Sequence, residues 1–289
     1  MPDALLTPLV PEADASPSAT PAGRKRRVLA GYRISFAIVV GAVLLAIFGP
    51  YIAPHDPNTQ NLLVRLQPPS SAHWLGTDDL GRDVFSRVLV AARVDVGVGI
   101  LGALFPFVLG TAIGGLAAYF GSVWDLMLMR LGDLVLAFPV YVLVIALVAV
   151  EGSSVKTLLF VFTVVGWVPY ARVVRAAVLQ VKGLDYITAA RLGGLSNGRV
   201  IVRHLLPNVI FNSVTVLITN VMVVLLTLAS FSYLGLGIQP PTAEWGAMIA
   251  EAQPYMQQQW WLVAAPGVMI AVIGFGFLSL GERFNERRH

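Results

Sequence analysis

The sequence lacks cysteine and is poor in charged residues. None of its 289 residues is Cys, which excludes a disulfide-linked secreted scaffold, a thiol enzyme and a cysteine-ligated zinc site. Charged residues make up 12% of the chain, about half the share found in soluble domains. Apolar residues make up 56% and the mean hydropathy is +0.74, more apolar side chain than one soluble core of this size can bury. The composition indicates an integral membrane protein.

Motifs for several chemistries are also missing. No Walker A sequence is present, so we expect no ATP binding through a phosphate loop. Gly97 to Gly102 matches the dinucleotide-binding pattern G-x-G-x-x-G, but it lies inside an apolar run with no preceding strand. Small residues in such a run favour close helix packing, as they do at Gly110-x-x-x-Gly114. The four histidines, His55, His73, His204 and His289, are scattered without H-E-x-x-H spacing. We therefore predict no catalytic residue and no metal site, and the net charge of +4 gives no indication of a nucleic-acid partner.

Long uncharged runs predict six transmembrane helices. A bilayer core of about 30 Å needs roughly 20 apolar residues of helix. The predicted spans lie at about 33–53, 96–119, 130–150, 156–176, 208–232 and 260–281. Because the runs are continuous rather than alternating, a transmembrane barrel is disfavoured. The predicted fold class is an all-α polytopic membrane protein.

The distribution of Lys and Arg predicts the orientation. Fifteen of these residues fall on one side of the predicted spans and five on the other, and the richer side is normally cytoplasmic. Both termini are then cytoplasmic. Residues 1–32 are predicted to be a disordered tail rich in Pro, Ala, Ser and Thr, with a basic cluster at Arg24–Arg27 that anchors the topology and could contact anionic lipid. The first apolar run is too long for a cleaved signal peptide, so it is expected to be retained.

The rest of the chain divides along the predicted spans. Residues 33–94 form the first helix and an outer loop, residues 95–281 a five-helix core with a cytoplasmic loop at 177–207, and residues 282–289 a cytoplasmic tail. Near the third span, Asp125 and Asp133 flank Arg130 at near-helical spacing. This pattern fits a salt-bridged helix end better than a proton relay, which would place acids near the middle of the bilayer.

The cytoplasmic loop carries a helical pattern of its own. Residues 184–194 predict a short helix that ends at Gly194, where a left-handed conformation is expected. Ser196 is a candidate cap for a second helix up to Leu206, and Pro207 is expected to break the chain before the fifth span. Ala189 and Ala190 leave a flat face for a partner, although a surface loop that binds nothing fits equally well. Asn197 is expected to be a neutral surface position.

The same loop resembles the EAA loop of importer-type ABC transporter permeases, E-A-A-x3-G-x9-I-x-L-P. The chain reads Thr188-Ala189-Ala190, then Gly194, then His204-Leu205-Leu206-Pro207, with every spacing matched. Thr188 stands where glutamate is usual and His204 where isoleucine is usual.

Two outer stretches are similar to the C-type permease of dipeptide, oligopeptide and nickel importers. The first runs from Tyr51 to Pro57 and continues through His73 to Asp83, and the second runs from Ser232 to Gly246. The resemblance covers about residues 51–281. Asp95 replaces what is commonly a small hydroxyl residue.

The resemblance implies a type I ABC importer permease in the bacterial inner membrane. It implies a heterodimer with a homologous B-type permease, two partner subunits that bind ATP and Mg²⁺, and an extracytoplasmic substrate-binding protein. The chain itself then holds no cofactor and is not an enzyme. Di- or oligopeptides are the expected substrates, with nickel or a metal chelate as the alternative.

The resemblance and the chemistry of the residues give three sets of candidate site residues. The residues expected to couple to the ATPase are Asp185, Thr188, Ala189, Ala190, Arg191, Gly194, His204 and Pro207. The outer-loop motif consists of Gly76, Thr77, Asp78, Gly81, Arg82 and Asp83. Its charged network could form a receptor surface or a lid, and it could equally be a loop held together by local salt bridges. The candidates for the translocation path are Asn212, Thr215, Thr219 and Asn220, whose polar side chains could equally serve helix packing.

Overall fold

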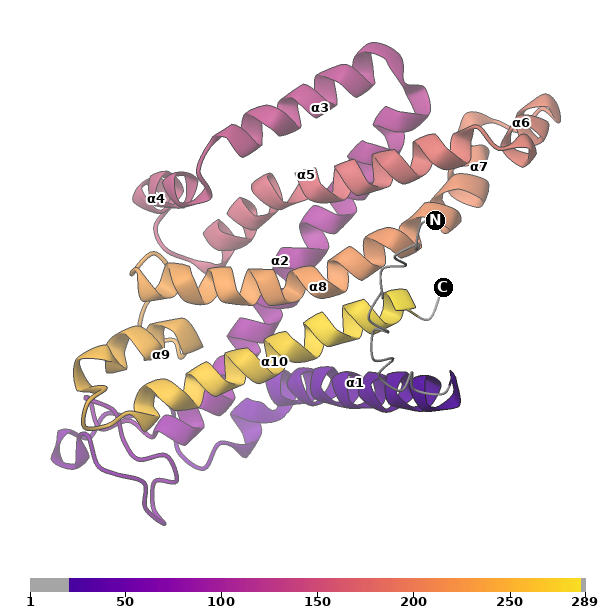
Figure 1. Ribbon diagram of the computed structural model, residues 1–289. Helices are drawn as coiled ribbons and strands as arrows, with labels where there is room; N and C mark the ends of the chain where they lie inside the picture. The colour runs from indigo at the N-terminus through magenta and orange to yellow at the C-terminus, as the bar shows by residue number, and fades with distance from the viewer. Residues whose placement is uncertain (1–20, 287–289) are drawn as a thin grey trace, which may run out of the picture.

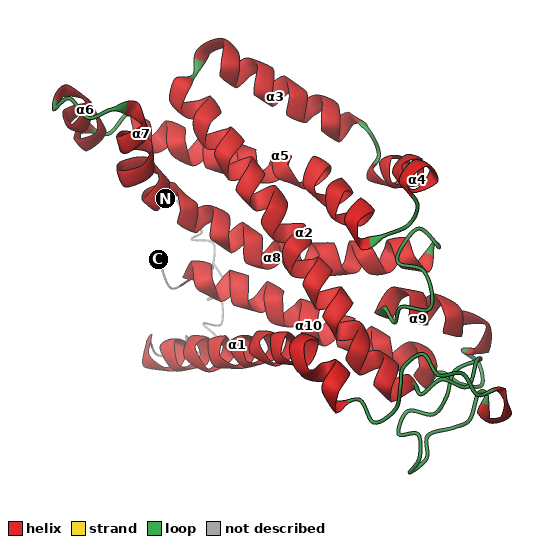
Figure 2. Cartoon of the chain, turned by 180° about the vertical axis from the view of Figure 1, so that it is seen from behind, coloured by secondary structure: helices red, strands yellow, loops and turns green. Residues whose placement is uncertain are grey.

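The computed structural model describes the backbone of residues 21–286 and the side chains of residues 31–284 apart from Arg191, Asn208 and Asn212. Within this range the chain is almost entirely helical and has no regular strand (Figures 1 and 2), which confirms the all-α class. The long helices are α1 (Pro21–Ile52), α2 (Val84–Phe120), α3 (Ser122–Ala137), α4 (Val140–Glu151), α5 (Val155–Lys182), α8 (Leu206–Tyr233) and α10 (Trp261–Glu286). The short ones are η1 (Leu62–Val64), α6 (Asp185–Leu192), α7 (Asn197–Val200), the π turn η2 (Ile201–Leu205), α9 (Trp245–Ala252) and η3 (Gln253–Tyr255).

The described helices account for the predicted spans. By length and composition, five of them can cross a membrane: α1 from Gly31, α2, α5, α8 from Val209, and α10 up to Phe284. The bent pair of α3 and α4 makes up to six. Residues 1–20 and 287–289, which belong to the two predicted tails, lie outside the described residues.

Several helices extend beyond the predicted spans. The first begins at Pro21, inside the segment predicted as a tail, and α2 begins at Val84 rather than near 96. Counting uncharged residues located only the apolar part of each helix. The first turns of α2 contain Arg87 and Asp95, which are each 1% exposed and have protein partners. Similarly, α10 runs to Glu286, so most of the predicted C-terminal tail is helical.

The predicted span 130–150 is wrong as a single helix. The chain breaks between α3 and α4, whose axes differ by 80°. Phe138 is extended, with φ −86° and ψ 130°, and Pro139 precedes the first turn of α4. A proline disfavours helical geometry in the residue before it and supplies no N–H to the preceding turn. The bend therefore follows from one residue within an otherwise uniform apolar run.

Helices α2 and α5 lie side by side through the centre of the molecule (Figures 1 and 2). At their contact, a methyl group on Gly110 would overlap the carbonyl oxygen of Trp167, and one on Gly114 would overlap that of Ala171. The two backbones thus touch directly. This confirms the interpretation of Gly110-x-x-x-Gly114 as a close-packing motif.

Two ion pairs attach α3 to this central pair of helices. Arg175 of α5 donates two hydrogen bonds of 2.6 Å to the carboxylate of Asp125, and Arg172 lies 2.8 Å from Asp133. The predicted salt-bridged helix end is present, but the acids pair with arginines about forty to fifty positions later in the chain rather than with Arg130. Sequence spacing within one helix could not reveal these partners.

The elements are sorted between two ends of the bundle. In Figure 1, the start of α1, the end of α10 and the short helices α6 and α7 lie at one end, whereas α9 and the loop before α2 lie at the other. The main apolar cluster surrounds Trp245, Phe231 and Leu228 and joins α2, α5, α8, α9 and α10. A second cluster lies beneath α6 and α7.

The close contact of α2 and α5 predicts that a single methyl group at Gly114 destabilises the chain. Gly114→Ala forces the helices apart and is expected to cost about 1–3 kcal/mol, the usual cost of overpacking. Gly97→Ala is the matched control, because no atom lies within 4 Å of the added methyl group and alanine favours helix. Thermal unfolding of the purified chain in detergent tests this. Equal melting temperatures for the two variants would contradict the close contact.

Candidate functional site

The first candidate site is a knob formed by residues 184–205, which comprises α6, α7 and the π turn. Ile187 and Val200 are fully buried and Leu205 is 2% exposed. They pack against Ala118 and Tyr119 at the end of α2 and against Val174, Ala177 and Val178 of α5. Apolar burial of this kind gives one fixed placement rather than a loose loop. The knob is thus anchored on the two central helices.

Gly194 ends α6 with the geometry that the sequence predicts. Its φ is +82°, in the left-handed region, which confirms that prediction. The amide of Leu195 donates to the carbonyl of Ala190 at 3.2 Å, and the amide of Gly193 donates to that of Ala189 at 2.9 Å. The bond from Leu195 to the carbonyl five residues earlier is the 6→1 hydrogen bond of a Schellman motif. This motif requires a residue that tolerates positive φ before Leu195. Gly194 therefore sets the direction in which the chain leaves α6.

The predicted break at Pro207 is wrong. The helix continues from α7 through the π turn into α8, and the amide of Leu206 donates to the carbonyl of Ile201 five residues earlier. A widened turn just before a proline removes the conflict between its ring and the preceding carbonyls. The end of the knob is therefore a rigid extension of α8.

The predicted coupling residues mostly face outward. Asp185, Thr188, Ala189, Gly194 and Pro207 are exposed, Ala190 and His204 are half-buried, and the side chain of Arg191 lies outside the described residues. Large apolar side chains flank them, with Leu184 at 47%, Tyr186 at 44% and Leu192 at 85% exposure. The face of α6 opposite Ile187 thus combines small residues with exposed apolar ones, a composition typical of a contact surface.

Contacts absent from the sequence prediction hold the knob in place. The hydroxyl of Tyr119 donates to Oδ1 of Asn197 at 2.7 Å. Lys182 Nζ donates to the last carbonyls of α2, at Ala118 and Tyr119, over 3.1 and 2.5 Å. Asn197 is therefore a structural contact rather than a neutral position. No local pattern could indicate this, because Tyr119 lies 78 positions away.

The outer-loop motif forms the second candidate site, and two of its glycines have backbone roles. Gly76 and Gly81 have φ of +70° and +72°. A side chain on them would overlap the carbonyl oxygens of Gln67 and Asn61 respectively. The hydroxyl of the buried Thr77 donates to the Val64 carbonyl and accepts from the Gln67 amide at 2.9 Å. These three residues fold the loop back on itself.

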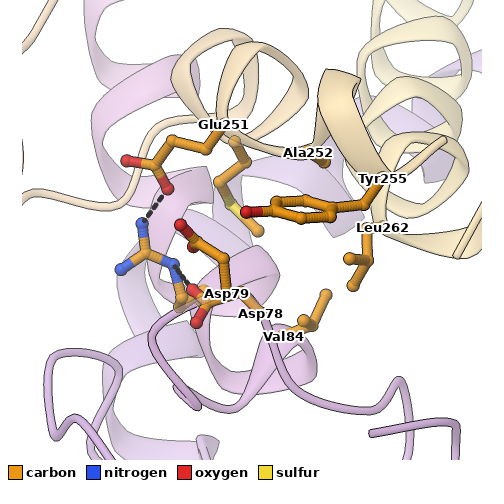
Figure 3. A pocket seen from close by; sticks show the side chains of 9 residues that line it. Asp78, Asp79, Val84, Glu251, Ala252, Tyr255 and Leu262 are labelled. Atoms are coloured by element: carbon orange, nitrogen blue, oxygen red, sulfur yellow. Dashed lines mark hydrogen bonds and ion pairs between the residues drawn. The ribbon is translucent and has the colours of Figure 1, made fainter. Parts of the chain in front are cut away.

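Charged residues then tie the loop to α9 (Figure 3). Arg82 is 2% exposed; its Nε lies 2.6 Å from Asp78, and another guanidinium nitrogen lies 2.8 Å from Glu251. Arg87, 1% exposed, contacts the same two acids at 3.5 and 3.4 Å. Two buried guanidinium groups are thus neutralised by carboxylates from both sides of the contact, as buried charges require.

Asp83 and Asp95 attach the loop and α9 to helix α2. Asp83 caps α2, where its Oδ2 accepts from the amide and hydroxyl of Ser86 at 2.8 and 2.7 Å. Burial alone would raise the pKa of Asp83, but hydrogen bonds from Ser86 and His73 bring the pKa below its usual value. Asp95 of α2 accepts from the Trp245 amide at 3.2 Å, and so holds the start of α9 against α2.

Two histidines that the sequence separates lie together in this loop. The rings of His55 and His73 have centroids 4.9 Å apart, and both Nδ1 atoms face the carboxylate of Asp83. The scatter of histidines along the sequence was therefore misleading about their spacing in the structure.

The candidates for the translocation path fall into different settings. Two of the hydroxyls donate to carbonyls of their own helix: that of Thr215 to Phe211, and that of Thr219 to Thr215. The Asn212 side chain lies outside the described residues. Asn220 lines a cavity of about 240 Å³ between α2, α5, α8 and the α3–α4 bend.

Comparison with known proteins identifies the family. The family described as the binding-protein-dependent transport system inner membrane component matches residues 110–289. The chain belongs to this family. A second match, to the N-terminal transmembrane domain of oligopeptide transport permease C, covers residues 33–69. Membership confirms a membrane transport subunit rather than an enzyme, with several spans.

Individual relatives are similar over most of their length. The oligopeptide transport system permease protein OppC of Bacillus subtilis is 34% identical over 253 residues, covering 88% of this chain and 83% of the relative. The dipeptide transport system permease protein DppC of Alkalihalophilus pseudofirmus is 35% identical over 252 residues, covering 86% and 83%. The probable D,D-dipeptide transport system permease protein DdpC of Escherichia coli K12 is 37% identical over 252 residues, covering 87% and 85%.

The charged contact between the loop and α9 predicts that Arg82→Met loosens the loop. Removing the guanidinium leaves Asp78 and Glu251 with one cation fewer, and breaking a buried ion pair costs on the order of 3 kcal/mol. Amide hydrogen exchange of residues 61–83 is expected to accelerate. Arg65→Met, an exposed position in the same loop, serves as the control. Unchanged exchange in Arg82→Met would show that the ion network does not hold the loop.

Proposed function

We propose that this chain is one of two permease subunits of an ATP-driven importer for di- or oligopeptides, and that the knob is the surface on which a partner ATPase subunit docks. One observation carries the proposal. The knob presents an exposed face of small and apolar residues around Ala189, while its buried face is fixed to α2 and α5. A surface that is both exposed and rigidly anchored can transmit a push from a partner.

The transmission follows from the connections of the knob. Its apolar side packs on α2 and α5, and its last turn is continuous with α8. A displacement of α6 therefore moves three spans together. ATP and Mg²⁺ are bound by the partner subunits in this proposal, and ATP binding drives the movement by favouring one arrangement of the helices over the other. A homologous B-type permease completes the path.

Peptides are the substrate class that the comparisons favour over nickel. The relatives named above are permeases for oligopeptides and dipeptides. Peptides of different sequence share only their backbone amides, so their path needs hydrogen-bonding groups rather than metal ligands. The amide of Asn220, at the cavity of about 240 Å³, supplies one such group.

The proposed orientation places the knob in the cytoplasm and the outer loop outside the cell membrane. The basic residues favour this direction. The described start of α1 and end of α10 share the end of the bundle that carries the knob (Figure 1), which fits cytoplasmic termini. The loop that contains Arg82 then faces the extracytoplasmic binding protein.

The complete transporter in liposomes tests the proposed function. The complex of this chain with its companion permease, ATPase subunits and binding protein is expected to accumulate a labelled peptide only with ATP, and Ala189→Arg should abolish copurification of the ATPase. Uptake of nickel without uptake of any peptide would overturn the substrate assignment. Normal transport by Ala189→Arg would overturn the docking site.

The geometry of Gly194 predicts a loss of coupling in Gly194→Val. A β-branched residue resists φ of +82°, so the start of α7 would be misplaced and peptide-stimulated ATP hydrolysis is expected to fall at least tenfold. Gly198→Val is a matched control, because neither glycine has an atom within 4 Å of the added Cβ and only Gly194 has positive φ. If both variants hydrolyse ATP equally, backbone conformation at Gly194 does not control coupling.

A further inference from the structure

Three side chains from distant segments converge at the outer end of α2. His55 follows α1, His73 lies in the long loop, and Asp83 caps α2. His73 Nδ1 is 2.9 Å from Asp83 Oδ1, and His55 Nδ1 is 3.7 Å from Asp83 Oδ2. One ligand atom from each of the three residues lies within 4.8 Å of those of the other two.

These distances suit a small divalent transition-metal ion. Zinc binds imidazole nitrogen and carboxylate oxygen at about 2.0–2.2 Å, so neighbouring ligands of a tetrahedral site are about 3.3 Å apart. His73 Nδ1 lies 2.9 Å from Oδ1 of Asp83, close to that value, and the ligand atoms of all three residues lie within 4.8 Å of one another. The three groups are therefore close enough to share one ion.

The neighbouring groups fix the Asp83 carboxylate and the backbone of the two histidines. The amide and hydroxyl of Ser86 occupy Oδ2 of Asp83 and leave Oδ1 turned toward His73. The same Ser86 hydroxyl accepts from the backbone amide of His55 at 3.1 Å, and Ser70 accepts from that of His73 at 3.1 Å. These contacts fix the backbone positions from which the two histidines extend toward Asp83.

The local charges and exposure also favour a cation. Asp83 is 3% exposed, and its Oδ1 lies on the side of the carboxylate that faces His73. The nearby Arg82 and Arg87 are turned to Asp78 and Glu251 and do not neutralise Asp83. The side chain of His55 is 44% exposed, which leaves a path for an ion from solvent.

We propose that His55, His73 and Asp83 bind one divalent transition-metal ion of the zinc class, with water in the remaining position. Two imidazoles and one carboxylate match the ligand preferences of such ions rather than those of calcium or magnesium. The ion joins the end of α1, the long loop and the start of α2. It is a structural ion of the outer loop and not transported cargo, so the inference does not depend on the proposed function.

Zinc titration of the purified full chain tests the site. The chain carries no cysteine that could bind zinc elsewhere, and a purification tag without histidine avoids zinc binding by the tag. We expect one Zn²⁺ per chain to remain after gel filtration and the melting temperature to rise with added ZnCl₂, since an ion that binds only the folded state stabilises it. X-ray absorption is expected to show nitrogen and oxygen neighbours with the signature of two imidazoles.

Variants decide whether these residues are the ligands. His55→Ala, at a largely exposed side chain, should fold normally and bind Zn²⁺ at least tenfold more weakly, and His73→Gln should do the same. His204→Ala, at the other end of the bundle, is the control and should bind like the unaltered chain. Absence of zinc binding, or binding unchanged in His55→Ala, would overturn the proposal.

Discussion

The direct contact between the backbones of α2 and α5 is the constraint on which the rest of the structure depends. It exists because Gly110 and Gly114 have no side chain where the carbonyls of Trp167 and Ala171 approach. The joined pair reaches from one end of the bundle to the other. Helix α8 and the helices around Trp245 pack against it, and α3 is attached through Asp125 and Asp133. A membrane protein needs such a contact, because lipid gives helices little hydrophobic reason to associate.

Each end of α2 is completed by a charge of the appropriate sign. Asp83 accepts hydrogen bonds at the N-terminus, and Lys182 donates to the last carbonyls at the C-terminus. Both charges oppose the helix dipole and satisfy groups that the helix leaves unpaired. The acid belongs to the outer loop and the lysine leads into the knob. The two candidate sites are thereby fixed to a single helix.

Features determined by neighbouring residues could be predicted from the sequence. The left-handed turn at Gly194, the close packing at Gly110 and Gly114 and most apolar spans depend on local backbone geometry and composition. Proline was less predictable. Pro139 separates two helices at 80°, whereas Pro207 lies within a continuous helix because a π turn precedes it. The residue type is the same and only the hydrogen bonding of the turn before it differs.

Contacts between distant segments could not be predicted from spacing. Asp125 meets Arg175, Tyr119 meets Asn197, and His55 meets His73, each through the packing of separate elements. The start of α2 was placed too late for a related reason. Charged residues were taken as the limits of helices, although Arg87 and Asp95 are buried inside α2 with partners from the loops and α9.

The central claim is that α2, α5 and the knob move as one body when a partner pushes the knob. Spin labels at Arg93→Cys on α2 and Gly198→Cys on α7 test it directly, because the chain has no other cysteine. Pulsed electron resonance would measure the distance between them in the assembled transporter with and without ATP. The account predicts an unchanged distance within this chain, while the distance from position 198 to a label on the companion permease changes. A shift of the internal distance as large as that external change would contradict it.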